Sequence, residues 1–258
     1  MIFREKNRLN ILICVKVVPD SETIVKIAPD GKNIEETNVR FAVNPYDEYA
    51  LEAGVQLKEK FGGEVTVISV GDENAAGVIK KCLPVGADKA IHLVAPNSRM
   101  MDALSIARIL SDEVSNHPFD IIFCGKTTID DQNGLVGELL GSLLNIPVIS
   151  AASQFSIEGE RAVASRDVDG TKEIVECALP CLITAEKGLT KPRYPSLREI
   201  MLAKKKQIES KTVISSEPIL YVLGMEYPPN RPSGKIIGEG ISAVPELIRL
   251  LREEAKIL

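Results

Sequence analysis

The sequence predicts an α/β protein with a mostly parallel, Rossmann-like sheet and helices on both of its faces. Strand-like and helix-like segments alternate through the first 150 of the 258 residues. The strand-like segments, such as Ile121 to Cys124, are short apolar runs, which is typical of strands that helices cover on both faces. A chain of this length can also bury a substantial core.

The elements of the first half follow from local signals. The first strand is expected at 9–18, followed by a hairpin that turns at 29–32. Asn44-Pro45 predicts the start of a helix, because asparagine can cap, proline suits the first turn and acidic residues follow; Gly62-Gly63 ends it. The alternation continues with strands at 64–70, 89–94 and 119–124, and with helices at 73–83, 102–114 and from 132–134 to 143.

Shorter segments follow residue 148. Strand-like pieces at 149–157, 161–168, 173–179 and 182–185 predict antiparallel additions to the same sheet. Two prolines make 188–197 a loop, and a helix is expected near 198–208. A segment with three prolines, 227–234, and an amphipathic helix at 244–255 complete the chain. We therefore predict an α/β domain over 1–210 and an extended arm over 211–258, which either packs on a partner or folds back on its own domain.

Composition excludes several functional classes. The formal charge of 31 minus 36, or −5, gives no general reason to expect nucleic-acid or membrane binding. No apolar run has the length of a membrane span and residues 1–8 lack a signal-peptide core, so we expect a cytoplasmic protein. Two distant histidines make a zinc site improbable. The five cysteines, without a CxxC motif, are expected to be reduced core thiols: Cys14, Cys82, Cys124, Cys177 and Cys181.

The loop after the strand at 119–124 is the strongest candidate for a ligand site. It turns polar at Gly125 and leads into a helix, whose free backbone N–H groups and positive dipole end attract phosphate. It matches neither GxxxxGK[ST] nor GxGxxG, so an ATPase P-loop and an ordinary dinucleotide site are not supported. A helix cap without a ligand is the alternative. The sequence shows no nucleophile paired with a base, and we expect no catalysis by its own side chains.

Several segments together resemble the beta subunit of electron transfer flavoproteins, over almost the whole chain. The resemblance implies an adenine nucleotide alpha hydrolase-like fold and a heterodimer with an alpha subunit that carries the redox-active FAD. In that family the beta subunit binds AMP, or a second FAD in electron-bifurcating members, and completes the flavin site. The segments are Cys14-Val-Lys-Val-Val-Pro-Asp20, Asn44-Pro-Tyr-Asp-Glu-Tyr-Ala-Leu-Glu52, Gly125-Lys-Thr-Thr-Ile-Asp-Asp-Gln-Asn-Gly134, Pro192-Arg-Tyr-Pro-Ser-Leu197, Ile200-Met201 and Ala203-Lys-Lys-Lys206.

The resemblance also implies which residues contact the nucleotide, and they lie at the carboxyl ends of the expected strands or just after them. Gly125 would let backbone approach the ligand, and amides near 132–134 would hold phosphate. Cys14 is either a backbone contact or an ordinary core cysteine, and Lys16 has no catalytic role. At least one of Asp130 and Asp131 is expected to face ribose hydroxyls or to cap the helix. The implied contacts are Cys14, Asn44, Pro45, Tyr46, Asp47, Val70, Gly125, Lys126, Thr127, Thr128, Ile129, Asp130, Asp131, Gln132, Asn133, Gly134, Leu135 and Val136.

A partner-recognition loop is implied at about 186–206. Leu197 holds the position of the family's anchor leucine, which inserts into an apolar pocket of acyl-CoA dehydrogenases; packing against the following helix is the alternative. Such docking passes electrons from flavin dehydrogenases, as in fatty acid oxidation, through FAD to a quinone-linked or other acceptor oxidoreductase. Asp167 stands where relatives have a glutamate that steers the flavin domain, and we expect only a solvated acid there. The docking residues are Pro192, Arg193, Tyr194, Leu197, Ile200 and Met201.

Three functions remain open at this point. The leading one is an AMP-binding electron-transfer subunit without catalysis of its own. A bifurcating subunit with FAD in place of AMP is the second, and the short carboxyl-terminal region favours the AMP-binding kind. The third is a stand-alone adenine-nucleotide sensor similar to universal stress proteins, against which the proline-rich arm argues.

Overall fold

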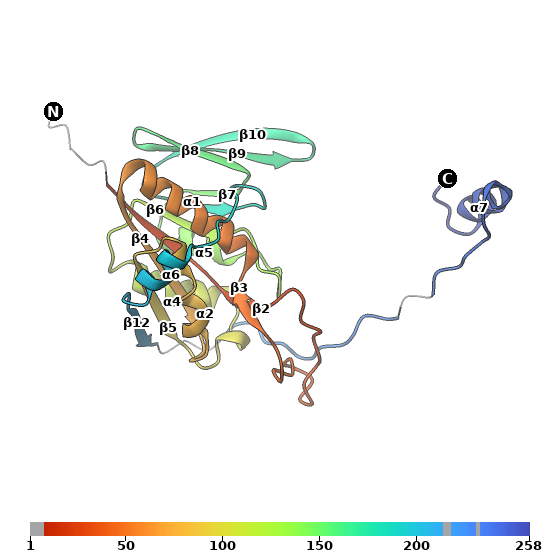
Figure 1. Ribbon diagram of the computed structural model, residues 1–258, viewed down its shortest axis with the longest axis horizontal. Helices are drawn as coiled ribbons and strands as arrows, with labels where there is room; N and C mark the ends of the chain where they lie inside the picture. The colour runs from red at the N-terminus through yellow and green to blue at the C-terminus, as the bar shows by residue number, and fades with distance from the viewer. Residues whose placement is uncertain (1–7, 214–217, 231–232) are drawn as a thin grey trace. The chain divides into compact units, whose positions relative to one another are not determined.

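The centre of the fold is a seven-stranded sheet with the order β12-β5-β4-β1-β6-β11-β7 (Figure 1). The computed structural model describes residues 8–213, 218–230 and 233–258. Every neighbouring pair of strands in this sheet is parallel, which confirms the predicted α/β class. The strands are β1 (Leu9–Cys14), β4 (Gly63–Gly71), β5 (Lys89–Val94), β6 (Ile121–Gly125), β7 (Val148–Ala152), β11 (Cys181–Ala185) and β12 (Ile208–Thr212).

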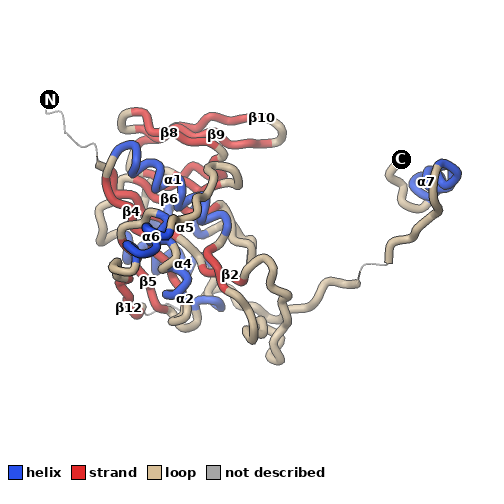
Figure 2. Tube along the Cα trace, viewed as in Figure 1, coloured by secondary structure: helices blue, strands red, loops and turns tan. Residues whose placement is uncertain are grey.

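Helices cover both faces of this sheet (Figures 1 and 2). One face carries α1 (Pro45–Phe61), α2 (Ala75–Ile79), α3 (Cys82–Val85) and α6 (Leu197–Ala203). The other carries α4 (Ala103–Val114) and α5 (Val136–Leu143). Successive residues of β1 alternate between the two cores, with Ile13 on the α1 side and Leu12 on the α4 side. Both faces of the strand are therefore buried, which explains its unbroken apolar sequence.

Helix α1 lies close against the sheet at a glycine. A Cβ atom on Gly54 would lie 2.6 Å from Cδ1 of Ile13, so a side chain at this position would push the helix away from β1. The predicted signals bound the helix well: it begins at Pro45 and ends before Gly62. This packing fixes the amino-terminal end of α1 at the edge where the strands end.

Two predicted strands are divided in the structure. The strand expected at 9–18 ends at Cys14, and β2 (Val17–Pro19) pairs antiparallel with β3 (Phe41–Val43) instead. The strand expected at 149–157 is divided between β7 and β8 (Gln154–Glu158). Ala151, the penultimate residue of β7, adopts a positive φ of 54° just before this break, and this value interrupts the extended backbone.

The predicted antiparallel strands are present, but the prediction that they extend the main sheet is wrong. Strands β8, β9 (Arg161–Val168) and β10 (Thr171–Ala178) form a separate antiparallel sheet in the order β10-β9-β8, while β7 and β11 join the parallel sheet. The rings of Phe155 and Phe123 meet edge to face at 5.2 Å, which attaches the small sheet to the core of the large one.

Two helix predictions also need correction. The segment 73–83 forms two short helices, α2 and α3, because Gly77 weakens a continuous helix and Pro84 cannot donate a backbone hydrogen bond. The helix expected at 198–208 ends at Ala203, and Ile208 begins the edge strand β12. This strand is mostly exposed and lacks an apolar run, so the sequence pattern did not predict it.

Outside these elements, the structure contains a hairpin turn and a separate carboxyl-terminal unit. Ile27 bridges Ile34 across the predicted turn, and η1 is the short helix Ser98–Met100. The chain divides into two compact units, Met1–Gly224 and Met225–Leu258. The second contains η2 (Ile241–Ala243) and the predicted amphipathic helix as α7 (Val244–Glu253). Residues 231 and 232 of the proline-rich segment, and residues 1–7 of the amino terminus, lie outside the described residues.

Among the described residues, no helix has both the length and the apolar character needed to cross a bilayer.

Candidate functional site

The candidate site lies where β1 and β6 end and α1 begins. On one side of β1 the sheet continues with β4 and β5, which follow β1 in the chain. On the other side it continues with β6, β11 and β7, which come later in the chain. The neighbouring strands β1 and β6 therefore mark the switch point of the sheet, and open parallel sheets bind ligands at the carboxyl ends of the strands beside such a point. The structure brings the segments after Cys14, around Asn44 and after Cys124 together there.

Asp47 connects two of these segments from the first turn of α1. Its Oδ2 accepts a hydrogen bond from the backbone N–H of Lys16 at 2.7 Å, and its Oδ1 accepts one from Gly125 at 2.9 Å. The side chain is buried, and this burial raises its pKa to about 7, although both backbone donors favour the ionised form. Asp47 is therefore a structural acid that fixes the ends of β1 and β6.

Asn44 does not cap α1, contrary to the local prediction. The fully buried amide turns to the loop after β6, where its Nδ2 donates to the carbonyl of Thr127 at 2.9 Å and its Oδ1 accepts from the N–H of Ile129 at 3.2 Å. A partner 83 residues away in sequence thus replaces the local cap. This side chain therefore attaches the loop after β6 to the start of α1.

Gly125 permits the close approach of β6 to α1. A Cβ atom at this position would lie 2.3 Å from Oδ1 of Asp47 and 2.7 Å from Cβ of Tyr46. The glycine is required by this contact rather than by an unusual φ. A ligand approach by Gly125, which we inferred from resemblance, remains a prediction.

Asp130 and Asp131 are paired with Lys16, whose side chain the sequence left without a role. Its Nζ lies 2.8 Å from Oδ2 of Asp130 and 2.9 Å from Oδ2 of Asp131. Burial opposes ionisation of both Lys16 and Asp131, but the opposite charges and hydrogen bonds outweigh it, so the pKa of Lys16 is raised and that of Asp131 is lowered. Lys16 thereby reduces the repulsion that two carboxylates would exert on an anion.

Asp131 also shapes the turn that precedes α5. Its Oδ1 accepts from the hydroxyl of Thr128 at 2.8 Å and from the N–H of Asn133 at 3.2 Å, while the N–H of Gln132 donates to the carbonyl of Thr128. Helix α5 begins at Val136, later than predicted, because Gln132 and Gly134 have positive φ. Two of the three amides expected to hold phosphate thus donate within the loop, and the first turn of α5 offers the amides that lack intrahelical acceptors.

Two buried polar atoms beside this turn lack a hydrogen-bond partner among the described residues: Oγ1 of Thr127 and Oε2 of Glu138. A Cβ on Gly134 would lie 4.0 Å from the Thr127 hydroxyl, so that hydroxyl lies directly beside the turn. Buried hydroxyls are normally hydrogen-bonded, and an orphaned one marks a position for a further partner. The Thr127 hydroxyl is thus suited to meet a polar ligand.

The two cysteines at this edge, Cys14 and Cys124, are buried. The pKa of Cys124 lies well above its usual range, because a hydrogen bond with the thiol of Cys14 and burial both favour the protonated form. All five cysteines are free, and all but the partly buried Cys177 are buried. The Cys124 thiol therefore does not have the character of a nucleophile.

The remaining predicted contacts surround this arrangement. Val70 is buried at the end of β4, and Pro45 and Tyr46 form the first turn of α1. The Nζ of Lys126 pairs with Glu186 at 2.5 Å, and Leu135 and Val136 form the start of α5, where Leu135 is half exposed. The structure therefore groups the residues predicted to contact the nucleotide at the carboxyl ends of the strands of the main sheet.

The predicted docking loop presents apolar side chains to solvent. Tyr194 is 98% exposed and Leu197 is 83% exposed, so Leu197 does not pack against its own helix. Ser196 caps α6 through a reciprocal pair of hydrogen bonds with Glu199. Ile200 and Met201 complete the exposed group, Pro192 is partly buried, and Arg193 points back to α1. Asp167 is an exposed residue of β9, in register with Lys172.

Sequence reasoning missed two acids of α1 that bind Arg193: Glu52 and Glu59. Glu52 is only 2% exposed and lies among the buried residues of the helix. A charged residue on the apolar face of an amphipathic helix is the signal that could have predicted a buried ion pair.

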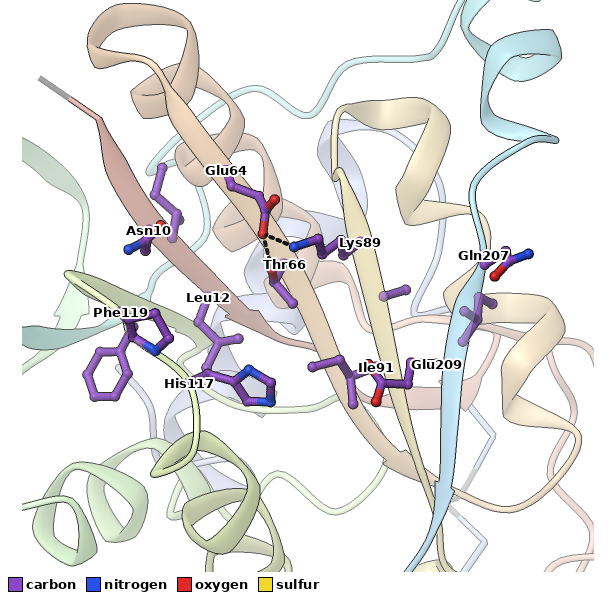
Figure 3. A pocket seen from close by; sticks show the side chains of 14 residues that line it. Asn10, Leu12, Glu64, Thr66, Lys89, Ile91, His117, Phe119, Gln207 and Glu209 are labelled. Atoms are coloured by element: carbon purple, nitrogen blue, oxygen red, sulfur yellow. Dashed lines mark hydrogen bonds and ion pairs between the residues drawn. The ribbon is translucent and has the colours of Figure 1, made fainter.

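A depression of about 580 Å³ lies at the opposite edge, where β1, β4, β5 and β12 begin (Figure 3). The ion pair between Glu64 and Lys89, 2.8 Å apart, lies across its wall beside Thr66. These charges already satisfy one another, and amino-terminal edges of parallel strands are not where such sheets bind ligands. Within the described ranges, no group of three potential metal ligands occurs.

Comparison with known proteins agrees with the geometry. The model of the electron transfer flavoprotein domain matches residues 32–216. The electron transfer flavoprotein subunit beta of Bacillus subtilis (strain 168) is 37% identical, covering 97% of this chain and 100% of the relative. The corresponding subunit of Mus musculus is 32% identical, and the match covers 96% of this chain and 99% of the relative. The mitochondrial subunit of Arabidopsis thaliana is 35% identical, and the match covers 97% of this chain and 100% of the relative. With an α/β fold and relatives matched over nearly their whole length, the chain belongs to the electron transfer flavoprotein family, as a beta subunit.

Proposed function

We propose that this chain binds AMP at the carboxyl edge of β1 and β6 as a structural ligand. The observation that carries the proposal is the buried hydroxyl of Thr127 near the start of α5, which has no hydrogen-bond partner in the described part of the chain. The first turn of that helix would receive the phosphate, while Lys16 offsets the charge of the neighbouring aspartates. AMP would thereby connect the loop 125–134 to the helix that follows it.

The chain acts as the beta subunit of a heterodimer whose alpha subunit binds most of the FAD. Bound FAD supplies the electron-accepting and electron-donating chemistry. This chain's residues contribute a surface that completes the flavin site and performs no side-chain catalysis. The raised pKa of the Cys124 thiol and the structural use of Asp47 support this assignment of roles.

Partner dehydrogenases dock at the exposed apolar residues of the loop and helix around Leu197. Acyl-CoA dehydrogenases are the proposed electron donors, and a quinone-linked or other oxidoreductase is the acceptor. Tyr194, Leu197 and Met201 are each more than half exposed, although apolar side chains gain free energy from burial. Leu197→Ala should weaken electron transfer from an acyl-CoA dehydrogenase and leave the FAD and AMP content unchanged.

The ligand proposal is tested by analysing the purified heterodimer after denaturation. We expect one FAD and one AMP per heterodimer, and less AMP in a Thr127→Val variant. Serine replacement at the same position keeps the hydroxyl and is the matched control. Two FAD and no AMP would identify the bifurcating type instead, and a stable lone chain without flavin would indicate a nucleotide sensor. Release of no adenine nucleotide would contradict the ligand proposal.

A further inference from the structure

Arg193 differs from the other predicted docking residues. Its charged guanidinium group faces helix α1. Its Nε and Nη2 donate to the two carboxylate oxygens of Glu52, each at 2.8 Å. Its Nη1 and Nη2 donate to Glu59 at 2.5 and 3.0 Å. The guanidinium thus binds two acids of α1 from a position 141 residues later than Glu52 in the chain. Four hydrogen bonds occupy most of its five donors.

The acid that anchors this arginine cannot reach a partner protein. Glu52 is 2% exposed, and its Oε1 also accepts a hydrogen bond from Gln56 at 2.7 Å. A buried carboxylate without a cation would be costly, so Arg193 and Glu52 require one another. The hydrogen bonds with Glu52 and Glu59 raise the pKa of Arg193. Its positive charge is therefore paired with acids of the same chain.

The same loop is fixed at two further points on either side of the arginine. The hydroxyl of Thr190 donates to the carbonyl of Tyr49 on α1 at 2.9 Å, and Ser196 caps α6. Tyr194 and Leu197 are the two most exposed apolar residues of the region. Tyr194 lies between these two anchored residues, and Leu197 directly follows Ser196. Three attachments therefore fix the backbone beneath side chains that make few contacts of their own.

We propose that Arg193 is a positioning residue, which clamps the loop onto α1 through Glu52 and Glu59 and holds Tyr194 and Leu197 ready for an apolar pocket of a partner dehydrogenase. This inference rests on the proposed docking function. An exposed loop that must become ordered on binding loses conformational freedom, and a loop fixed beforehand avoids that cost. The clamp thus contributes to affinity without touching the partner.

The decisive variant is Glu52→Gln, because Glu52 is buried and has no route to a partner. In the heterodimer, Arg193→Gln and Glu52→Gln should each speed amide hydrogen exchange across 189–196 and weaken binding of an acyl-CoA dehydrogenase by about tenfold. The double variant should weaken binding no more than either single one, since both remove the same interaction. Arg193→Lys should restore binding only in part, because lysine cannot form the bidentate pair.

Two controls separate the clamp from the docking function. Leu197→Ala should weaken binding without changing exchange across 189–196. If Leu197→Ala binds the dehydrogenase as the unmodified heterodimer does, the docking function fails. If Leu197→Ala weakens binding while Glu52→Gln leaves both binding and exchange unchanged, the clamp is overturned and docking stands. A reduced salt dependence of association in Arg193→Gln alone would show direct contact with the partner and would also overturn the clamp.

Discussion

At the scale of single residues, Asp47 shows how a buried acid couples the site to pH. Burial raises its pKa from an ordinary 3.8 to about 7. The folded state therefore holds the proton more tightly than the unfolded chain does. Its contribution to stability is fully present below pH 3.8 and is lost as the pH rises through about 7.

Replacing Asp47 with asparagine should remove this pH dependence. One of the two backbone donors would then face an NH₂ group, so we expect a loss of about 1–3 kcal/mol at pH 5. The difference from the unmodified protein should shrink toward pH 8, because only the unmodified carboxyl loses stability over that range. Unfolding midpoints of the heterodimer at fixed concentration, measured from pH 5 to 8, test this. A difference that stays constant or grows with pH would contradict the assignment.

Lys16 is the second residue whose removal has a defined consequence. Lys16→Met leaves Asp130 and Asp131 without their cation, and the repulsion of two carboxylates should lower AMP affinity by roughly tenfold. Titration of nucleotide-depleted heterodimer with AMP measures this. Adding Asp131→Asn to the variant should recover part of the affinity. An unchanged affinity in Lys16→Met would show that these charges do not act on the ligand.

The site residues differ in how far sequence could predict them. Resemblance indicated Asn44, Asp47 and the loop after Cys124, and the parallel topology explains why they meet. Their bonds were not predictable, since the local signal made Asn44 a cap while its partners lie 83 and 85 residues away. The ion pairs of Lys16 and Glu52 were missed for the same reason, because their partners lie in distant segments; the place of Glu52 on the apolar face of α1 could signal a buried pair but not its partner.

At the scale of elements, Asp102 connects two segments that local patterns treat separately. Its Oδ1 caps α4 by accepting from Ser105 at 2.7 Å, and its Oδ2 accepts from the N–H groups of Ile219 and Leu220 at 2.6 and 2.9 Å. Partial burial would raise its pKa, but these backbone donors outweigh it and lower the pKa to about 2. The favourable contribution is present above pH 3.8 and is lost as the pH falls through about 2.

Two substitutions separate the roles of Asp102. Asp102→Ala removes both, so α4 should lose about 1 kcal/mol of capping and the amides of Ile219 and Leu220 should exchange faster. Asp102→Asn should keep the cap of α4, because asparagine caps a helix as well as aspartate does. Its NH₂ group, however, cannot accept the hydrogen bonds from Ile219 and Leu220. Hydrogen exchange should then rise at 219–220 and not at the start of α4. If the two variants show the same exchange rates at 219–220 and at the start of α4, the two roles assigned to Asp102 are not separate.

Element prediction succeeded where the signal was local and failed where pairing was remote. Asn44-Pro45 and Gly62-Gly63 bound α1 within a residue, since proline and glycine act on their own backbone. Strand β12 is a short, largely exposed edge whose pairing with β5 joins segments more than 100 residues apart. Its polar sequence contains no signal of that partner.

At the scale of the whole molecule, the unit Met225–Leu258 has too few residues to bury a core of its own. It contains Ile236 and Ile241, which are 89% and 90% exposed, and α7 carries half-exposed Val244, Leu247 and Ile248. An amphipathic helix with so much apolar surface requires a second surface to cover it. We propose that the alpha subunit provides that surface.

Removing residues 225–258 should separate folding from assembly. The first unit ends at Gly224 and keeps the hydrogen bonds of Asp102 with Ile219 and Leu220, so the truncated chain should fold with an unfolding midpoint close to that of the full chain. Its affinity for the alpha subunit should fall by on the order of a hundredfold, because several buried apolar anchors are lost together.

Two variants of the full chain make the test specific to the apolar face of α7. Leu247→Glu with Ile248→Glu should weaken assembly as truncation does, whereas Glu253→Gln with Glu254→Gln, on exposed positions, should not. Size-exclusion chromatography and titration calorimetry with the alpha subunit measure the outcome. If the truncated chain assembles normally but unfolds at a much lower temperature, the segment folds back on its own domain, because its apolar surface then stabilises this chain alone.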